Sequence, residues 1–152
     1  MYLISRCLLG DRCKYNGGHN RSEAVLQFAA GHTVIGICPE TAGGLQAPRE
    51  PAEWQGDRCR DRAGKDLTEA FVRGAESELA RAEEAARQAG ETLEGAILKA
   101  NSPSCGAGMI YDGTFSGTKV PGDGCFTRLL RAKGVPVCTE KDLTAEGEEQ
   151  ES

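Results

Sequence analysis

Short apolar runs interrupt a mostly polar chain, and four of them have the length and composition of buried β-strands. These runs cover residues 2–6, 33–37, 95–98 and 135–138. Short apolar runs bounded by glycine and proline are typical of strands buried in a parallel sheet. Pro136 in the last run favours an edge position, because proline cannot donate a hydrogen bond to a neighbouring strand.

The segments between the first three runs, and the one before the last run, carry apolar side chains at helical spacing. Three helices are predicted, with capping residues Asn20, Asp66 and Asp123 at their starts and Gly31, Gly90 and Gly134 after their ends. The longest helix runs to about Ala89. Strands and helices that alternate in this way are typical of parallel crossover units. We therefore predict an α/β fold, a single three-layer domain with a mostly parallel, Rossmann-like sheet and helices on both faces.

Two further segments are predicted to be loops at the same edge of this sheet. Residues 45–65 contain two prolines and only one large aromatic group, Trp54, so we expect an irregular lid or binding loop. Residues 109–124 are rich in turn formers, and Asp112 is interpreted as one of them. The chain ends in acidic residues without an apolar anchor. We expect the folded domain to cover residues 1–142 and an acidic disordered tail to cover residues 143–152.

Length and charge narrow the functional classes. The 152 residues suit one domain, and no apolar run approaches the ~20 residues that a membrane helix needs. The net charge is −5, but four glutamates lie in the tail, which leaves 19 acidic residues against 18 Lys and Arg. Without a broad basic field, duplex nucleic acid is not an expected partner. The N-terminus lacks the features of a signal peptide, so we expect a cytoplasmic protein whose thiols stay reduced.

Seven cysteines in such a compartment indicate metal binding or catalysis, and the odd number argues against a full set of disulfides. Cys7, Cys38 and Cys105 each follow an apolar run and precede turn residues. Parallel strands end at one edge of the sheet, where ligands bind in open α/β folds. Converging thiolates suit an iron–sulfur cluster or a thiol-dependent enzyme, and the spacing favours neither. Zinc fits poorly, because only two histidines and no C-x2-C pair are present.

The other cysteines need separate interpretations. Cys125, in a predicted helix, and Cys138, in a predicted strand, are interpreted as small buried hydrophobic residues. Cys59 lies among charged residues and is interpreted as an incidental loop thiol. Cys13 follows Cys7 by six positions in a loop rich in glycine and asparagine, so we expect it to line the same pocket.

Several motifs together resemble the thiouracil desulfidase family. They are CLLGDRCKYNG, CPETAGGLQAPREPAE, GKDLTEAFVRGA, ILKANSPSCG, YDGTF and PGDGCFTRLL, in that order, and they cover nearly the whole chain except the tail. The resemblance implies a 4Fe-4S cluster held by three protein thiolates, with one open iron, and non-redox removal of sulfur from a small-molecule thio-substrate such as thiouracil. By motif, the ligands are Cys7, Cys38 and Cys105, with Cys13 as a rival for one place. Lys14 and Asn16 stand where the family often has Arg and Asp.

The resemblance also implies roles for neighbouring polar residues. An open iron would polarise a C=S bond, and the attacking water would need a general base, for which Glu40 is the best-placed carboxylate. The alternative for Glu40 is a structural cap or an ion pair with Arg49. Ser102 and Cys13 are further catalytic candidates. Candidates for substrate binding are Ser104, Asn101 and Gly44, although Ser104 also suits a turn-capping role around Pro103.

Two other functional classes stay open at this point. One is a metal-free thiol or sulfur-transfer enzyme that uses Cys13 or Cys105 as its nucleophile. The other is a sensor or binding module whose cluster reports oxygen or iron, with the acidic tail as its only partner surface in the sequence. The oligomeric state has no sequence signal.

Overall fold

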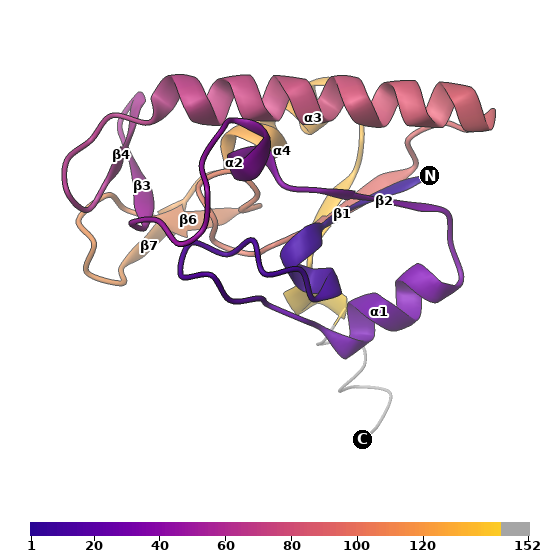
Figure 1. Cartoon of the computed structure of the whole chain (residues 1–152), viewed down its shortest axis with the longest axis horizontal. Coiled ribbons are helices and arrows are strands. Elements are labelled where there is room, and N and C mark those ends of the chain that lie inside the picture. Colours follow the sequence, from indigo (N-terminus) through magenta and orange to yellow (C-terminus); the bar gives the residue numbers. More distant parts are fainter. Residues whose placement is uncertain (144–152) are drawn as a thin grey trace.

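The protein is built on a four-stranded parallel sheet in a computed structural model, of which residues 1–143 are described. The strands are β1 (Tyr2–Ser5), β2 (Val34–Ile37), β5 (Gly95–Leu98) and β8 (Val137–Thr139). They lie in the order β2-β1-β5-β8, and every neighbouring pair is parallel (Figure 1). The predicted α/β fold is confirmed, and β8 is an edge strand as Pro136 indicated.

Alternate residues of each strand enter two separate cores on opposite faces of the sheet. Leu3 of β1 faces α3 (Thr68–Ala89) and α4 (Cys125–Ala132), where Phe71 and Phe126 are fully buried. Ile4, the next residue, packs instead with residues of the 3-10 helix η1 (Arg6–Leu9) and α1 (Glu23–Ala30). Figure 1 shows α3 along one side of the sheet and α1 on the other, which completes three layers.

The short helix α2 (Pro39–Ala42) packs closely against α3 through two glycines. A Cβ atom at Gly74 would overlap the carbonyl oxygen of Pro39, and one at Gly43 would overlap that of Ala70. This close approach therefore requires glycine at both positions. It matters for the site because α2 directly follows Cys38 and contains Glu40.

The helix ends differ in detail from the predicted capping residues. Helix α1 is capped by Ser22, whose Oγ accepts a hydrogen bond from the backbone N–H of Val25 (3.3 Å), rather than by Asn20. The backbone N–H of Asn20 donates to the Cys7 carbonyl instead (2.9 Å). The N-cap of α3 is Leu67, although Asp66 accepts a hydrogen bond from the N–H of Thr68 (2.9 Å).

Helix α4 is also capped differently from the prediction. Its N-cap is Gly124, not Asp123. The Asp123 carboxylate instead accepts a hydrogen bond from the N–H of Gly108 (2.7 Å) and pairs with Arg131 (3.4 Å). The side chain that was expected to cap a helix therefore fixes the adjoining loop. The stops after α1 and α3 lie at Gly31 and Gly90 as expected.

Both predicted loops form antiparallel hairpins instead. The first consists of β3 (Ala52–Gln55) and β4 (Arg58–Asp61), and the second of β6 (Met109–Tyr111) and β7 (Lys119–Pro121). In the first, Trp54 and Cys59 are paired across the strands and both are buried. The interpretation of Cys59 as an incidental loop thiol is therefore wrong. Charged residues around this pair hid the strand pattern, because Cys59 is the one residue of β4 in the core and in β3 only the small Ala52 packs there beside Trp54.

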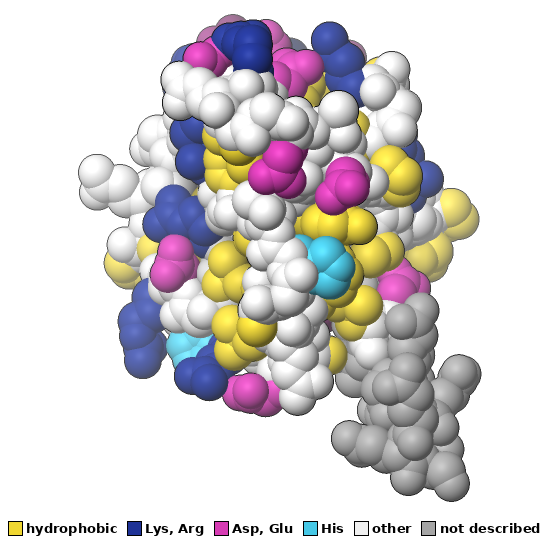
Figure 2. Space-filling model, turned by 90° about the vertical axis from the view of Figure 1, so that its right-hand side faces the viewer, with side chains coloured by type: hydrophobic (Ala, Val, Ile, Leu, Met, Phe, Trp, Pro, Cys, Tyr) yellow, Lys and Arg dark blue, Asp and Glu magenta, His cyan; other side chains and the backbone are white. Residues whose placement is uncertain are grey.

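Two observations concern the surface and the chain end. No helix within residues 1–143 is long and apolar enough to cross a membrane. On the face shown in Figure 2, basic and acidic side chains are interspersed among hydrophobic ones, and duplex nucleic acid binding stays untested. The predicted tail lies outside the described residues except for Leu143, which packs against the core around Ile4 and Leu8.

Candidate active site

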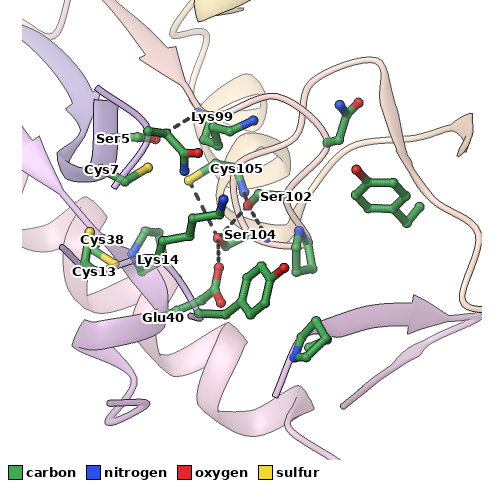
Figure 3. Close-up of a pocket in the computed structure, with 18 of the residues that line it drawn as sticks. Ser5, Cys7, Cys13, Lys14, Cys38, Glu40, Lys99, Ser102, Ser104 and Cys105 are labelled. Carbon is green, nitrogen blue, oxygen red and sulfur yellow. Dashed lines mark hydrogen bonds between the residues drawn. The ribbon is translucent and has the colours of Figure 1, made fainter. Parts of the chain in front are cut away.

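Three of the cysteines meet because their strands are adjacent. Cys38 directly follows β2, Cys7 lies in η1 after β1, and Cys105 lies in the turn after β5, while β1 is the central strand of these three. All three line one cavity of about 410 Å³ at the carboxyl edge of the sheet (Figure 3). Cys13 lines the same cavity, as predicted from its loop. The cavity is therefore lined by four thiols.

Cys13 lies between two of the other thiols. It is buried beside the sulfurs of Cys7 and Cys38, and its one S–H proton forms hydrogen bonds that are shared between them. These bonds raise the pKa of Cys13 far above its ordinary value and lower the pKa of Cys7. Bonding to Asn20 and the positive charge of Lys99 further lower the pKa of Cys7, although burial opposes them. Cys7 is thus the more readily ionised thiol of this pair.

Cys38 is held from both its backbone and its side chain. The buried carboxylate of Glu78 accepts a hydrogen bond from the Cys38 backbone N–H (2.8 Å). The sulfur of Cys38 lies 3.1 Å from the hydroxyl of Thr41 in α2. The S–H of Cys13, followed by Thr41, lowers the pKa of Cys38 to about 6 against the opposing effect of burial. Cys38 therefore carries a thiolate that suits either metal ligation or nucleophilic attack.

Cys105 is the most enclosed of the three predicted ligands. Burial raises the pKa of its thiol above the ordinary value, while Ser5 and Ser104 donate hydrogen bonds to the sulfur, the latter at 3.7 Å. Thr127 of α4 donates to the Cys105 carbonyl (2.9 Å), which fixes the backbone. Ser102 Oγ accepts from the N–H of Cys105 (2.9 Å) and so closes the turn.

Glu40 has both oxygens engaged, and the ion pair with Arg49 that was the structural alternative is present. Oε1 forms an ion pair with Arg49 (3.1 Å), and Oε2 accepts a hydrogen bond from Ser104 Oγ (2.8 Å). Ser104 Oγ also lies 3.1 Å from Ser102 Oγ. The carboxylate is thereby held in one orientation at the cavity wall, below Ser104 in the view of Figure 3.

The remaining predicted residues differ in whether they line the cavity. Asn101 lines the cavity and adopts a left-handed backbone conformation (φ 66°), which is uncommon for a residue other than glycine. Lys14 also lines it. Gly44 is exposed after α2 and is not part of the cavity wall. Asp112 accepts from the N–H of Thr114 (2.9 Å), in agreement with a turn-forming role.

Several cavity residues were not predicted as site residues. Arg49 was considered only as an ion-pair partner, yet it also donates to the carbonyl of Cys13 (3.0 Å) and so joins two parts of the wall. Its Nη1 is buried and has no hydrogen-bond partner among the described residues. The two hairpins contribute Glu53, Tyr111 and Phe115. The only sequence signal for the last two was the YDGTF motif.

The cysteine sulfurs that line the cavity suit a polynuclear cluster better than a single metal ion. Within the described part of the chain, no three His, Cys, Asp or Glu side chains converge in a way that would hold one metal ion. In a 4Fe-4S cluster each thiolate binds a different iron, so the ligands surround the group instead of meeting at one point. Soft sulfur donors around a common cavity match that requirement.

The fold and the cavity together define a class of protein: an α/β protein with a sulfur-rich site at the carboxyl edge of a parallel sheet. The family model for 2-thiouracil desulfurase matches residues 2–142. The chain belongs to the 2-thiouracil desulfurase family and is therefore an enzyme of the desulfidase type.

The chain is also similar to one relative of uncharacterized function and to one solved desulfidase structure. The chain is 41% identical over 153 residues to the uncharacterized protein YbbK of Bacillus subtilis (strain 168), covering 94% of this chain and 97% of YbbK. Among solved structures, it is similar to the 4Fe-4S-dependent thiouracil desulfidase TudS, at 40% identity and a TM-score of 0.81. That match covers 95% of this chain and 93% of TudS.

Proposed function

We propose that the protein removes sulfur from a thiocarbonyl nucleobase, 2- or 4-thiouracil or a close analogue, with the help of a 4Fe-4S cluster. Overall, one C=S bond and one water are consumed, and a C=O bond and sulfide are formed, so no electron is transferred. The observation that carries the proposal is the meeting of Cys7, Cys38 and Cys105 at one cavity, with the fixed carboxylate of Glu40 in its wall.

Cys7, Cys38 and Cys105 are the proposed ligands. Two of them have pKa values lowered by hydrogen bonding from Cys13, and metal ligation requires thiolates. When bound, the cluster would supply an iron without a protein ligand, a thiophilic Lewis acid that polarises the C=S bond and takes the sulfur. Cys13 is proposed to remain a thiol beside the ligands, where its one S–H proton is shared between two of them.

Glu40 is proposed as the general base. Its carboxylate faces the cavity and is oriented by Arg49 on one oxygen and Ser104 on the other. A water within reach of Oε2 could lose a proton to this oxygen as it attacks the thiocarbonyl carbon. Ser102 acts through Ser104, because their hydroxyls are in contact (3.1 Å) and its own Oγ also closes the cysteine turn.

The substrate is proposed to contact the turn residues Asn101 and Ser104. Arg49 offers a further donor, because its buried Nη1 lacks a partner among residues 1–143 and a bound water or a substrate oxygen would satisfy it. A reducing compartment, the cytoplasm, is the proposed location, because cysteines that hold a cluster at this cavity have to stay reduced.

The direct test is anaerobic purification followed by assays of iron, acid-labile sulfide and thiouracil turnover. The expected result is a coloured protein with about four irons per chain that releases one sulfide for each thiouracil converted to uracil. An iron-free protein with the same activity would overturn the cluster and favour the metal-free thiol mechanism, for which the low pKa of Cys38 offers a nucleophile. A clustered protein without activity on any thiocarbonyl base would favour a sensor.

A further inference from the structure

The cavity extends well beyond the cysteines. Its wall includes residues of the first hairpin region, among them Glu53 and Arg62, and of the second, among them Tyr111 and Phe115. Strand β3 contacts β6, so the two hairpins form one structure beside the sheet edge, where Figure 1 shows them grouped together. The proposed chemistry uses none of these residues, yet they form part of the wall of the same cavity as the cysteines.

Phe115 is held in an unusual backbone conformation. Its φ of 57° lies in the left-handed region, which is sterically unfavourable for a bulky side chain and persists only where the surroundings impose it. The ring is half-buried and lines the cavity, with the guanidinium carbon of Arg62 at 5.9 Å from its centroid. An aromatic ring is therefore placed at the cavity wall at a conformational cost.

Glu53 supplies the contacts that impose this conformation. It is a buried carboxylate, and its Oε1 accepts hydrogen bonds from the backbone N–H groups of Gly113 (2.9 Å) and Phe115 (3.2 Å). Gln55 donates to the Gly113 carbonyl (2.8 Å). A Cβ atom at Gly113 would lie 2.6 Å from the Trp54 carbonyl, so the loop approaches β3 as closely as glycine permits.

We propose that Phe115 is a specificity-determining residue whose ring packs against the flat ring of a heteroaromatic thio-substrate, and that Glu53 is the positioning residue that holds it there. The inference rests on the proposed function, because it names the part of that cavity that recognises the ring. Aromatic side chains stack on planar bases whatever their exact substituents, so this contact selects ring-shaped substrates over small acyclic thiocarbonyl compounds.

The test compares a ring ligand with an acyclic one in the anaerobically purified holoenzyme. Phe115→Ala should raise KM for 2-thiouracil by about 5- to 100-fold, the usual cost of removing an aromatic stacking partner. KM for thiourea should change less than about twofold, because it has no ring to stack. Ser116→Ala is the matched control, an exposed substitution in the same loop outside the cavity wall.

Glu53 is tested by truncation and conservative rescue. Glu53→Ala should raise KM for 2-thiouracil in the same direction as Phe115→Ala, with kcat little changed, because the loop loses both hydrogen bonds. Glu53→Gln keeps an oxygen that can accept both bonds and should restore KM. Equal effects of the Ala and Gln variants would remove Glu53 from this role, and Phe115→Ala still tests the ring contact if Glu53→Ala fails to fold.

A binding readout separates this inference from the proposed function. Uracil has the ring but no sulfur, and its binding can be followed by the fluorescence of the single tryptophan, Trp54, whose indole donates to the Pro103 carbonyl at the cavity wall. Wild-type binding that Phe115→Ala weakens would support the ring contact even without turnover. Equal uracil binding by the wild type and Phe115→Ala would overturn the ring contact. A wild type that binds neither uracil nor thiouracil better than thiourea would overturn it as well. Neither result bears on desulfuration, which the sulfide-release assay tests separately.

Discussion

Replacement of Glu40 by glutamine separates catalysis from cluster assembly. Glutamine keeps the length of the side chain, and its Oε1 can still accept from Arg49. Its amide Nε2 would face Ser104, whose hydroxyl can turn from donating to accepting. The contact of Ser104 with Ser102 also allows the hydroxyl protons to rearrange. The site keeps its hydrogen bonds and loses only a negative charge and a proton acceptor.

Two free energies bear on this substitution: the contribution of the ion pair to stability and the contribution of a general base to the rate. The Arg49 and Glu40 side chains are 13% and 17% exposed, so their pair is partly desolvated. A charge-assisted hydrogen bond contributes about 1.5–3 kcal/mol and the neutral bond that glutamine would make about 0.5–1.5 kcal/mol, so the substitution loses about 1–2 kcal/mol. A loss of that size lowers the melting temperature of a domain of this length by roughly 2–8 °C. General-base assistance contributes about 10²–10⁴ in rate, which corresponds to about 3–5 kcal/mol in the activation barrier.

The assay is sulfide release from thiouracil under anaerobic conditions, with iron content and visible absorption measured on the same samples. Glu40→Gln should keep the iron and the colour and lose about 10²–10⁴ in kcat. Glu50→Gln, at an exposed carboxylate one residue after Arg49, is the control for a general charge effect. Full activity of Glu40→Gln at neutral pH would refute the base assignment, whereas loss of iron would show that Glu40 serves assembly instead.

Three further predictions follow from the same geometry. Cys7→Ser and Cys105→Ser should each lose most of the iron and the activity, while Cys13→Ser should keep most of the iron; an inverted pattern would exchange Cys7 and Cys13. In protein stripped of metal, alkylation of Cys38 by iodoacetamide should rise through pH 6 and level off by about pH 8, because thiolate forms with a pKa of about 6, and Cys13→Ala should move this rise to higher pH. Gly74→Ala should lower the melting temperature although alanine favours helices by about 1 kcal/mol, because its Cβ would displace the Pro39 carbonyl; unchanged melting would refute the close packing of α2 on α3.

The parallel sheet was predictable because its strands are continuous apolar runs between glycine-bounded helices. A strand is a continuous apolar run when both of its faces are buried, and these strands lie between helices on both faces of the sheet. The two hairpins were not predictable in this way. Trp54 and Cys59 are the paired core residues of β3 and β4, so the alternation that marks a strand is almost absent. Strands β3 and β4 form because they pair with each other, and the order of apolar and polar residues along one strand does not show such pairing.

The residues of the candidate site also differ in whether the sequence could predict them. The three cysteines were predictable because strand ends in a parallel sheet share an edge, and their placement needs only the strand order. Cys13, by contrast, comes from a loop, and only the structure shows that it lies beside the sulfurs of Cys7 and Cys38, so that its pKa is coupled to theirs. Arg49 and Glu53 are further examples, because a charged residue in a polar segment looks the same in the sequence whether it faces solvent or a buried partner.

Helix packing and catalysis are coupled in this protein through α2. The helix has one turn and no stable conformation of its own, so its position depends on α3, which it meets where Gly43 and Gly74 allow the backbones to touch. The same α3 provides the buried Glu78 that holds the Cys38 backbone. One long helix therefore positions both the proposed ligand at the start of α2 and, through α2, the proposed base Glu40. A change in the α2–α3 contact would then reduce cluster binding and turnover together, whereas changes at the hairpins should alter substrate affinity alone.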